Sequence, residues 1–342
     1  MSTRWLVNII DKPLPKISNP TSEQSRLIAL WSEFFPPHPE DGYGDFEDYF
    51  EQAVRLDAAL NSFGRDYIHL ITSYKSGNAK DLATGKMNPY SELLDIPRFG
   101  EQEKNASLAA PHNISLVSER RADRYMSSPA FIANSGRKMV LTGNHAGEQD
   151  IYRDVYEMAQ QGVRRIFIKT AETKKGIWQL DIDDTLTTSD IRNRLLTELD
   201  WTLIRYEEVK NAFLVQEFVQ MNYEYRLFVV DGSVVTASGC IEEYTPLNNR
   251  GNAFDEVVRH TRIGNPSPVE FLPEVTAELV EFGSAVAKEM AAEEPEMYAF
   301  TLDVAMDKNG IPLVIERNGM LNAGLYASQP QRVSDALAQL AF

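Results

Sequence analysis

A β-hairpin pattern near the C-terminal end places the strongest constraint on how this chain can fold. Two apolar runs, residues 299–306 and 311–316, flank the turn-forming sequence Asp307-Lys-Asn-Gly310. Apolar runs separated by an Asn-Gly turn are typical of two adjacent antiparallel strands. The sequence therefore predicts a sheet in this region, with one strand on each side of the turn.

Three polar side chains interrupt this hairpin: Asp303 in the first run, and Glu316 and Asn318 at the end of the second. Pairing places Asp303 roughly opposite Glu316, and Asn318 shares the face of Glu316 because alternate residues of a strand point the same way. Two carboxylates and one amide carbonyl are hard oxygen ligands, which suit Mg²⁺ carried by nucleotide phosphates. The alternative is an exposed polar strand face. The apolar neighbours favour the metal site, because a cation removes the repulsion between inward-facing carboxylates.

Composition narrows the class of protein. A length of 342 residues favours about two domains, and the formal net charge of −16 argues against nucleic acid as a partner. Arg120, Arg121 and Arg124 form either a local basic patch or a solvated helix face. A single cysteine, Cys240, fits a reducing compartment. No apolar run approaches the roughly 18 residues of a membrane span, so we expect a cytoplasmic protein with no membrane partner.

Apolar periodicity predicts an N-terminal α/β unit followed by a mixed region of helices and strands. Between residues 74 and 112 the periodicity fades, which indicates a long connection, a lid or a domain boundary. The other expected helices and strands, besides the hairpin above, are helices at 53–63, 150–161, 189–199 and one starting at Pro273, and strands at 5–10, 67–72, 163–169, 176–182, 213–219, 225–230 and 234–238.

Lysines at the end of one strand predict a phosphate-binding loop. Lys169 ends the apolar run 166–169, and the polar turn after it contains Lys174, Lys175 and Gly176. A mobile loop of backbone amides and ammonium groups can neutralise a polyphosphate. The alternative for Lys169 is an ordinary strand end that meets solvent.

A third pattern suits a nucleoside. The extended segment 213–219 can present backbone N–H and C=O groups to an adenine edge, and Glu224 can accept hydrogen bonds from ribose hydroxyls. Arg226 shares the face of Glu224 and can contact phosphate bidentately. The alternative is a plain amphipathic hairpin with an internal Glu/Arg pair.

Taken in this order, from about residue 118 to 326, these patterns resemble the ATP-grasp superfamily. The resemblance implies an α+β fold in which two α+β subdomains enclose ATP, preceded by a smaller α/β domain. The expected boundaries are 1–115 for the N-terminal domain, 116–212 for the first ATP-grasp subdomain and 213–342 for the second. The residues that the resemblance implies for ATP are Lys169 and Lys175 for phosphate, Gln216, Glu217, Phe218 and Val219 for adenine, and Glu224 for ribose, while Asp303, Glu316 and Asn318 are implied for Mg²⁺.

The sequence departs from members similar to D-alanine–D-alanine ligase in two places. Those members carry an earlier phosphate-binding lysine, where this chain has the run 122–126, so Arg124 and Lys138 are competing candidates. After Asn318 the chain continues with Gly319-Met-Leu-Asn-Ala-Gly324 instead of a small-Pro-Gly turn. The substrate side of the site is therefore open on the sequence.

The family chemistry implies an ATP- and Mg²⁺-dependent ligase that activates a carboxylate as an acyl phosphate and joins it to an amine. The expected partners are small-molecule or peptide carboxylates and amines. Arginines are needed to hold an anionic carboxylate in line, and Arg226, Arg250 and Arg262 are the candidates for this catalytic role. A phosphotransferase on the same fold, a nucleotide-binding module without turnover and a nucleic-acid end-joining enzyme are the alternatives. The oligomeric state stays open, with a homodimer as one option.

Overall fold

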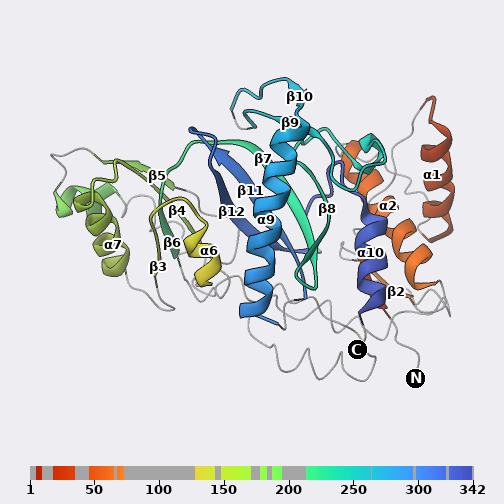
Figure 1. Cartoon of the computed structure of the whole chain (residues 1–342), viewed down its shortest axis with the longest axis horizontal. Coiled ribbons are helices and arrows are strands. Elements are labelled where there is room, and N and C mark those ends of the chain that lie inside the picture. The colour runs from red at the N-terminus through yellow and green to blue at the C-terminus, as the bar shows by residue number, and fades with distance from the viewer. Residues whose placement is uncertain are drawn as a thin grey trace.

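The computed structural model describes residues 5–9, 18–34, 46–64, 68–72, 128–142, 148–170, 178–182, 187–194, 213–262, 264–295, 298–320 and 323–340. The elements, in chain order (Figure 1), are β1 (Trp5–Ile9), α1 (Ser22–Phe34), α2 (Phe46–Phe63), β2 (Ile68–Thr72), α6 (Pro129–Ala133), β3 (Met139–Thr142), α7 (Glu148–Gln160), β4 (Arg165–Thr170), β5 (Trp178–Asp181), β6 (Phe213–Glu217), β7 (Met221–Val230), β8 (Ser233–Gly239), the 3₁₀ turn η4 (Pro246–Asn248), β9 (Val257–Arg259), β10 (Val269–Phe271), α9 (Pro273–Glu293), β11 (Ala299–Asp307), β12 (Pro312–Gly319) and α10 (Pro330–Gln339). None of the described helices is both long and apolar enough to cross a lipid bilayer.

The N-terminal region contains the expected α/β unit. Strands β1 and β2 pair in parallel, as an intervening helical connection permits, and α2 lies between them in the chain. Helices α1 and α2 share a small apolar cluster that includes Leu27, Trp31 and Leu56. The expected helix at 53–63 is the second half of α2, and Gly64 ends it with a φ of 80°.

The first large sheet has four strands in the order β3-β6-β4-β5, and all neighbours are antiparallel. Helix α7 covers one face, and its Ile151 and Val155 pack with Ile166, Ile168 and Val215 of the sheet. The strands expected at 163–169, 176–182 and 213–219 are therefore confirmed, with ends shifted by one to two residues. Strand β3 is the element of this sheet that the sequence pattern did not predict.

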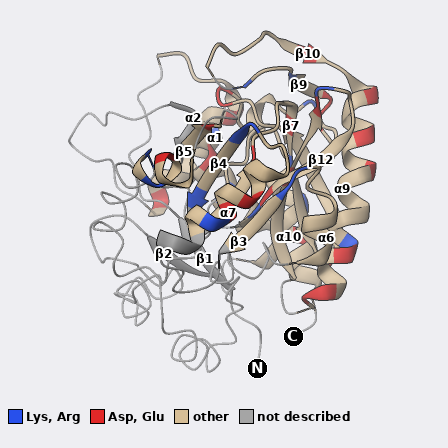
Figure 2. Ribbon diagram, turned by 90° about the vertical axis from the view of Figure 1, so that its left-hand side faces the viewer, with Lys and Arg blue, Asp and Glu red and all other residues tan. Residues whose placement is uncertain are grey.

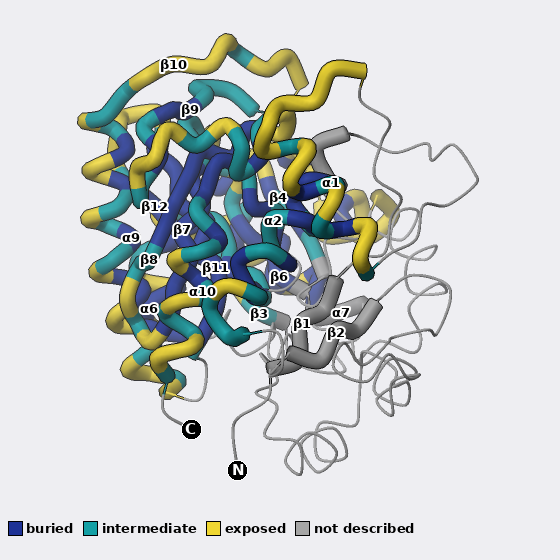
Figure 3. The backbone as a smooth tube through the Cα atoms, turned by 90° about the vertical axis from the view of Figure 1, so that its right-hand side faces the viewer, coloured by how far each residue is buried: buried dark blue, intermediate teal, exposed yellow. Residues whose placement is uncertain are grey.

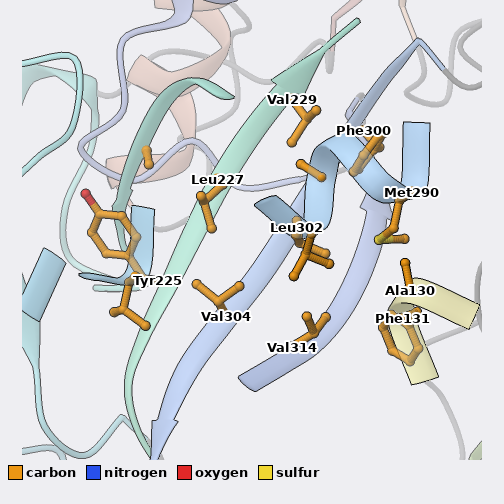
Figure 4. Packing of buried hydrophobic residues seen from close by; sticks show 14 of the residues in the cluster. Ala130, Phe131, Tyr225, Leu227, Val229, Met290, Phe300, Leu302, Val304 and Val314 are labelled. Carbon is orange, nitrogen blue, oxygen red and sulfur yellow. The ribbon is translucent and has the colours of Figure 1, made fainter. Parts of the chain in front are cut away.

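The second large sheet has the order β12-β11-β7-β8 and lies between α9 and α10 (Figures 1 and 3). Alternation along β7 sets its two faces: Tyr225, Leu227 and Val229 belong to the cluster beneath α9 (Figure 4), and Phe228 and Val230 belong to the cluster beneath α10. The hairpins expected around Asp231-Gly232 and Asn309-Gly310 are both confirmed.

Helix α9 packs closely on β7 and is charged on its outer side. A Cβ atom on Gly283 would lie 2.7 Å from Cδ2 of Leu227, so this close approach requires glycine. Acidic residues follow the outer side of the helix (Figure 2), where Glu274, Glu278 and Glu281 are exposed. They carry part of the net charge of −16.

A β-bulge in β12 sends two neighbouring side chains to opposite faces of this sheet. Asp303 pairs with Glu316, but Val304 pairs with Val314, so Ile315 is left without a cross-strand partner. One extra residue inverts the alternation of side chains. Val314 therefore packs in the cluster beneath α9, while Glu316 faces the opposite side with Asp303.

The carboxyl group of Asp255, before β9, supports a prediction about stability and pH. Burial raises its pKa to about 6, and its Oδ2 atom has no hydrogen-bond partner. A raised pKa means that the folded state binds the proton more tightly, so this contribution to stability is lost as pH rises from about 4 to 6. We expect the unfolding free energy of wild type, minus that of Asp255→Asn, to fall by about 1–3 kcal/mol between pH 4 and pH 7. Urea unfolding at both pH values checks this, and a constant difference would contradict it.

Candidate nucleotide and metal site

The face of the second sheet opposite α9 holds a buried ion pair at its centre. Arg226 of β7 donates from Nε to Asp303 Oδ1 and from Nη2 to Asp303 Oδ2, both at 2.7 Å. The two side chains are 2% and 0% exposed, and they are cross-strand neighbours. Burial lowers the pKa of Arg226, but the charge and hydrogen bonds of Asp303 outweigh this and raise it well above its ordinary value. Arg226 is thus committed to orienting Asp303.

Glu316 and Asn318 complete a three-residue polar group beside this pair. Asn318 Nδ2 lies 3.1 Å from Glu316 Oε1 and 3.3 Å from Asp303 Oδ2, so it donates to both carboxylates. Lys169, at the end of β4 in the other large sheet, reaches Glu316 Oε2 with its Nζ atom at 3.1 Å. The structure therefore brings together the three expected metal ligands and the expected phosphate lysine.

Glu224 lies next to this group and is held by Arg262. The guanidinium Nη1 donates to Glu224 Oε1, and Nη2 donates to the hydroxyl of Tyr326 at 3.1 Å. Burial raises the pKa of Glu224; the charge of Arg262 opposes that shift, and the charges of Asp303 and Glu316 add to it. A carboxylate with these surroundings gains from hydrogen-bond donors such as ribose hydroxyls.

The backbone is strained on both sides of Glu224. Between Asn222 and Tyr225, β7 takes three residue steps against two on β11, and Tyr223 within this bulge has a φ of 57°. Tyr326 has a φ of 47°, also in the left-handed region that residues other than glycine rarely adopt. Such strain persists only where the surroundings impose it, and it is frequent at ligand sites.

Arg137, just before β3, joins the two large sheets and was not a candidate on the sequence. Its Nε donates to the Gln216 side chain at 2.8 Å, and its Nη1 and Nη2 donate to the carbonyls of Val314 and Ile315 at 2.7 and 2.9 Å. The Ile315 carbonyl belongs to the bulged residue of β12. Arg137 therefore ties the end of β6 to the strand that carries Glu316.

The expected adenine segment leaves the first sheet at the end of β6. Gln216 is buried against Arg137, while Phe218 is 37% exposed and lies beneath Arg165, whose Cζ is 5.3 Å from the ring centroid. The N–H groups of Glu217 and Phe218 donate to the carbonyls of Lys138 and Arg165. The chain then passes through Val219 into β7, which carries Glu224.

Two further candidates point elsewhere. Lys138 donates from Nζ to the carbonyl of Gln161, just after α7, at 2.9 Å. Arg250 is exposed after η4, and the charge on its side chain acts on Asp255. Arg124 and Lys175 lie outside the described residues.

Residues 147–336, more than half of the chain, match a family model described as an ATP-grasp domain, the second family of its clade. The chain belongs to the ATP-grasp superfamily. No curated protein matches it.

Solved structures are similar to this chain at low identity. D-cycloserine synthetase DcsG is 12% identical with a TM-score of 0.50, covering 98% of this chain and 99% of its own. D-alanyl-alanine synthetase A from Vibrio cholerae is 13% identical with a TM-score of 0.49, covering 98% and 96%. VanG D-Ala:D-Ser ligase from Enterococcus faecalis is 12% identical with a TM-score of 0.49, covering 98% and 99%.

The superfamily implies ATP with a divalent cation, and the residues present fit this group. Asp303, Glu316 and Asn318 offer two carboxylates and one amide oxygen on one face. Within the described ranges there is no cluster of three or more His, Cys, Asp or Glu side chains that could hold a metal as a dedicated cage. Mg²⁺ bound to a nucleotide needs few protein oxygens, because phosphates and waters fill its other positions.

Proposed function

We propose that this ATP-grasp protein is an ATP- and Mg²⁺-dependent ligase that activates a carboxylate as an acyl phosphate and joins it to an amine. The observation that carries the proposal is the meeting of Lys169 from one sheet with Asp303, Glu316 and Asn318 from the other. A chain with this arrangement can hold polyphosphate between two sheets. The substrates we propose are small-molecule or peptide carboxylates and amines.

Each residue has a role that follows from its contacts. Lys169 exchanges its ion pair with Glu316 for a phosphate oxygen, and Glu224 exchanges Arg262 for ribose hydroxyls. Asp303, Glu316 and Asn318 would hold Mg²⁺, which when bound supplies positive charge to the phosphoryl group. Arg262 is partly exposed beside the site and is our choice for holding the substrate carboxylate. Arg226 orients Asp303.

Product analysis tests the reaction type. Wild type with Mg-ATP is given a panel of amino acids and short peptides, and ADP release is followed together with mass spectrometry of the products. Carboxylate-dependent ADP release, with a hydroxamate formed when hydroxylamine is the nucleophile, is the expected result. A stable phosphorylated product without ligation would select the phosphotransferase, and Mg-ATP binding without any turnover would select the binding module.

Lys169→Met should raise the Kd for Mg-ATP about 10-fold, because a phosphate oxygen loses a charged hydrogen-bond donor in a partly buried position. Isothermal titration calorimetry measures the change. Lys138→Met is the contrast, since that ammonium binds the Gln161 carbonyl. Equal losses of affinity in the two variants would contradict the placement of the phosphate lysine.

A further inference from the structure

Helix α2 lies outside the matched residues 147–336, yet it holds the backbone that follows β12. We call Met320 and residues 323–326 the post-β12 segment. Glu51 Oε1 accepts hydrogen bonds from the N–H groups of Leu325 and Tyr326 at 2.7 and 3.0 Å. Arg55, one turn further along α2, donates to the carbonyls of Met320 and Ala323.

The post-β12 segment in turn contacts the arginines of the site. The Gly324 carbonyl accepts a hydrogen bond from Arg226 Nη1 at 3.2 Å. The ring of Tyr326 lies 5.2 Å from the Arg226 guanidinium and 5.9 Å from that of Arg262. A continuous series of contacts thus runs from Glu51 and Arg55, through the segment, to Arg226 and its partner Asp303.

Packing alone does not explain the residue types on α2. Glu51 is 9% exposed, and Arg55 has a buried Nε with no hydrogen-bond partner. Burying charged groups is unfavourable, and apolar side chains would dock a helix at lower cost. Charged groups instead fix backbone N–H and C=O groups in defined directions, as needed to hold Tyr326 at its positive φ.

We propose that Glu51 and Arg55 are positioning residues of the nucleotide and metal site, which act by fixing the post-β12 segment and thereby the Arg226–Asp303 pair. The inference rests on the proposed role of Asp303 as a magnesium ligand. Helix α2 is then a working part of the ATP-grasp site. Loss of its contacts weakens the dependence of ATP binding on Mg²⁺, because the carboxylate of Asp303 is no longer held in its orientation.

The test is calorimetric titration of the full-length protein with ATP at a series of Mg²⁺ concentrations and in EDTA. For Glu51→Met and Arg55→Gln we expect the Mg²⁺ concentration for half-maximal ATP binding to rise at least about 10-fold, with affinity in EDTA changed less than about 2-fold. Glu51→Gln keeps an oxygen acceptor and should stay within about 3-fold of wild type.

Ser62→Ala is the matched control, because Ser62 also joins α2 to the C-terminal part of the chain. Its hydroxyl donates to Asp335 and accepts from Gln331, each at 2.7 Å. Wild-type Mg²⁺ dependence is expected for this variant. The inference is overturned if Glu51→Met and Arg55→Gln also behave as wild type, or if Ser62→Ala shows the same shift.

Hydrogen exchange of wild type tests the contacts without any variant, should the substituted proteins fail to fold. The amides of Leu325 and Tyr326 should exchange as slowly as those of β12, and rapid exchange would overturn the inference. The two proposals fail differently. Without Mg²⁺-dependent ATP binding by wild type, the metal site and this inference both fall; with it, unchanged variants remove only the role of α2.

Discussion

Glu316→Gln is expected to reduce ADP-forming turnover at least about 100-fold, the scale seen when one group that stabilises transition-state charge is removed. Gln is isosteric with Glu and can still accept a hydrogen bond from Lys169, which lies 3.1 Å away. The change therefore removes one negative charge from the metal site and little else. Turnover is measured as ADP release at saturating substrate.

Stability separates this effect from misfolding. Glu316 is 17% exposed and lies beside Lys169, so loss of its charge leaves no group without a partner in the sheet interior. We expect Tm to stay within about 3 °C of wild type, since a surface-like change costs little. Full activity of Glu316→Gln would remove Glu316 from the metal site.

Arg226→Met is expected to lower the free energy of unfolding by about 3–5 kcal/mol, because removal of one partner from a buried ion pair leaves an uncompensated charge. Asp303 is 0% exposed, and both of its oxygens accept hydrogen bonds from Arg226. This is a large part of the stability of an ordinary domain. Urea unfolding at low temperature, followed by tryptophan fluorescence, measures the loss.

The double variant Arg226→Met/Asp303→Leu is the control for that prediction. It removes both charges and fills the space with apolar atoms, so it should recover most of the stability that the single variant loses. It should also abolish Mg²⁺-dependent ATP binding. A loss below about 1 kcal/mol in Arg226→Met would show that Asp303 does not depend on this pairing.

Local pattern was sufficient to predict the metal-site hairpin. The turn at Asn309-Gly310 fixes which residues oppose each other, and Asp303 does pair with Glu316. The bulge at Ile315 was not predicted, because the sequence from Val314 to Asn318 alternates without a visible break. Residues that pair within a few positions are readable, whereas an extra residue in one strand shows only in the register.

Contacts between distant segments could not be read from the sequence. Glu51 and Arg55 have the i, i+4 spacing of an exposed helix face, and only the folded chain covers them with the post-β12 segment. The sequence places Arg226 on one face with Glu224, but it does not show that β11 is the neighbouring strand. That neighbour commits Arg226 to Asp303, and for this reason we assign substrate contact to Arg262.

The measurement that tests the central claim most directly is calorimetric titration with ATP, with and without Mg²⁺, on wild type and Glu316→Gln. Asp303→Asn is a poorer probe, because it leaves the buried Arg226 without its partner charge. We predict Mg²⁺-dependent binding by wild type and, for Glu316→Gln, affinity that Mg²⁺ no longer improves. Absence of ATP binding by wild type, or equal Mg²⁺ dependence in both proteins, would contradict the proposed nucleotide and metal site.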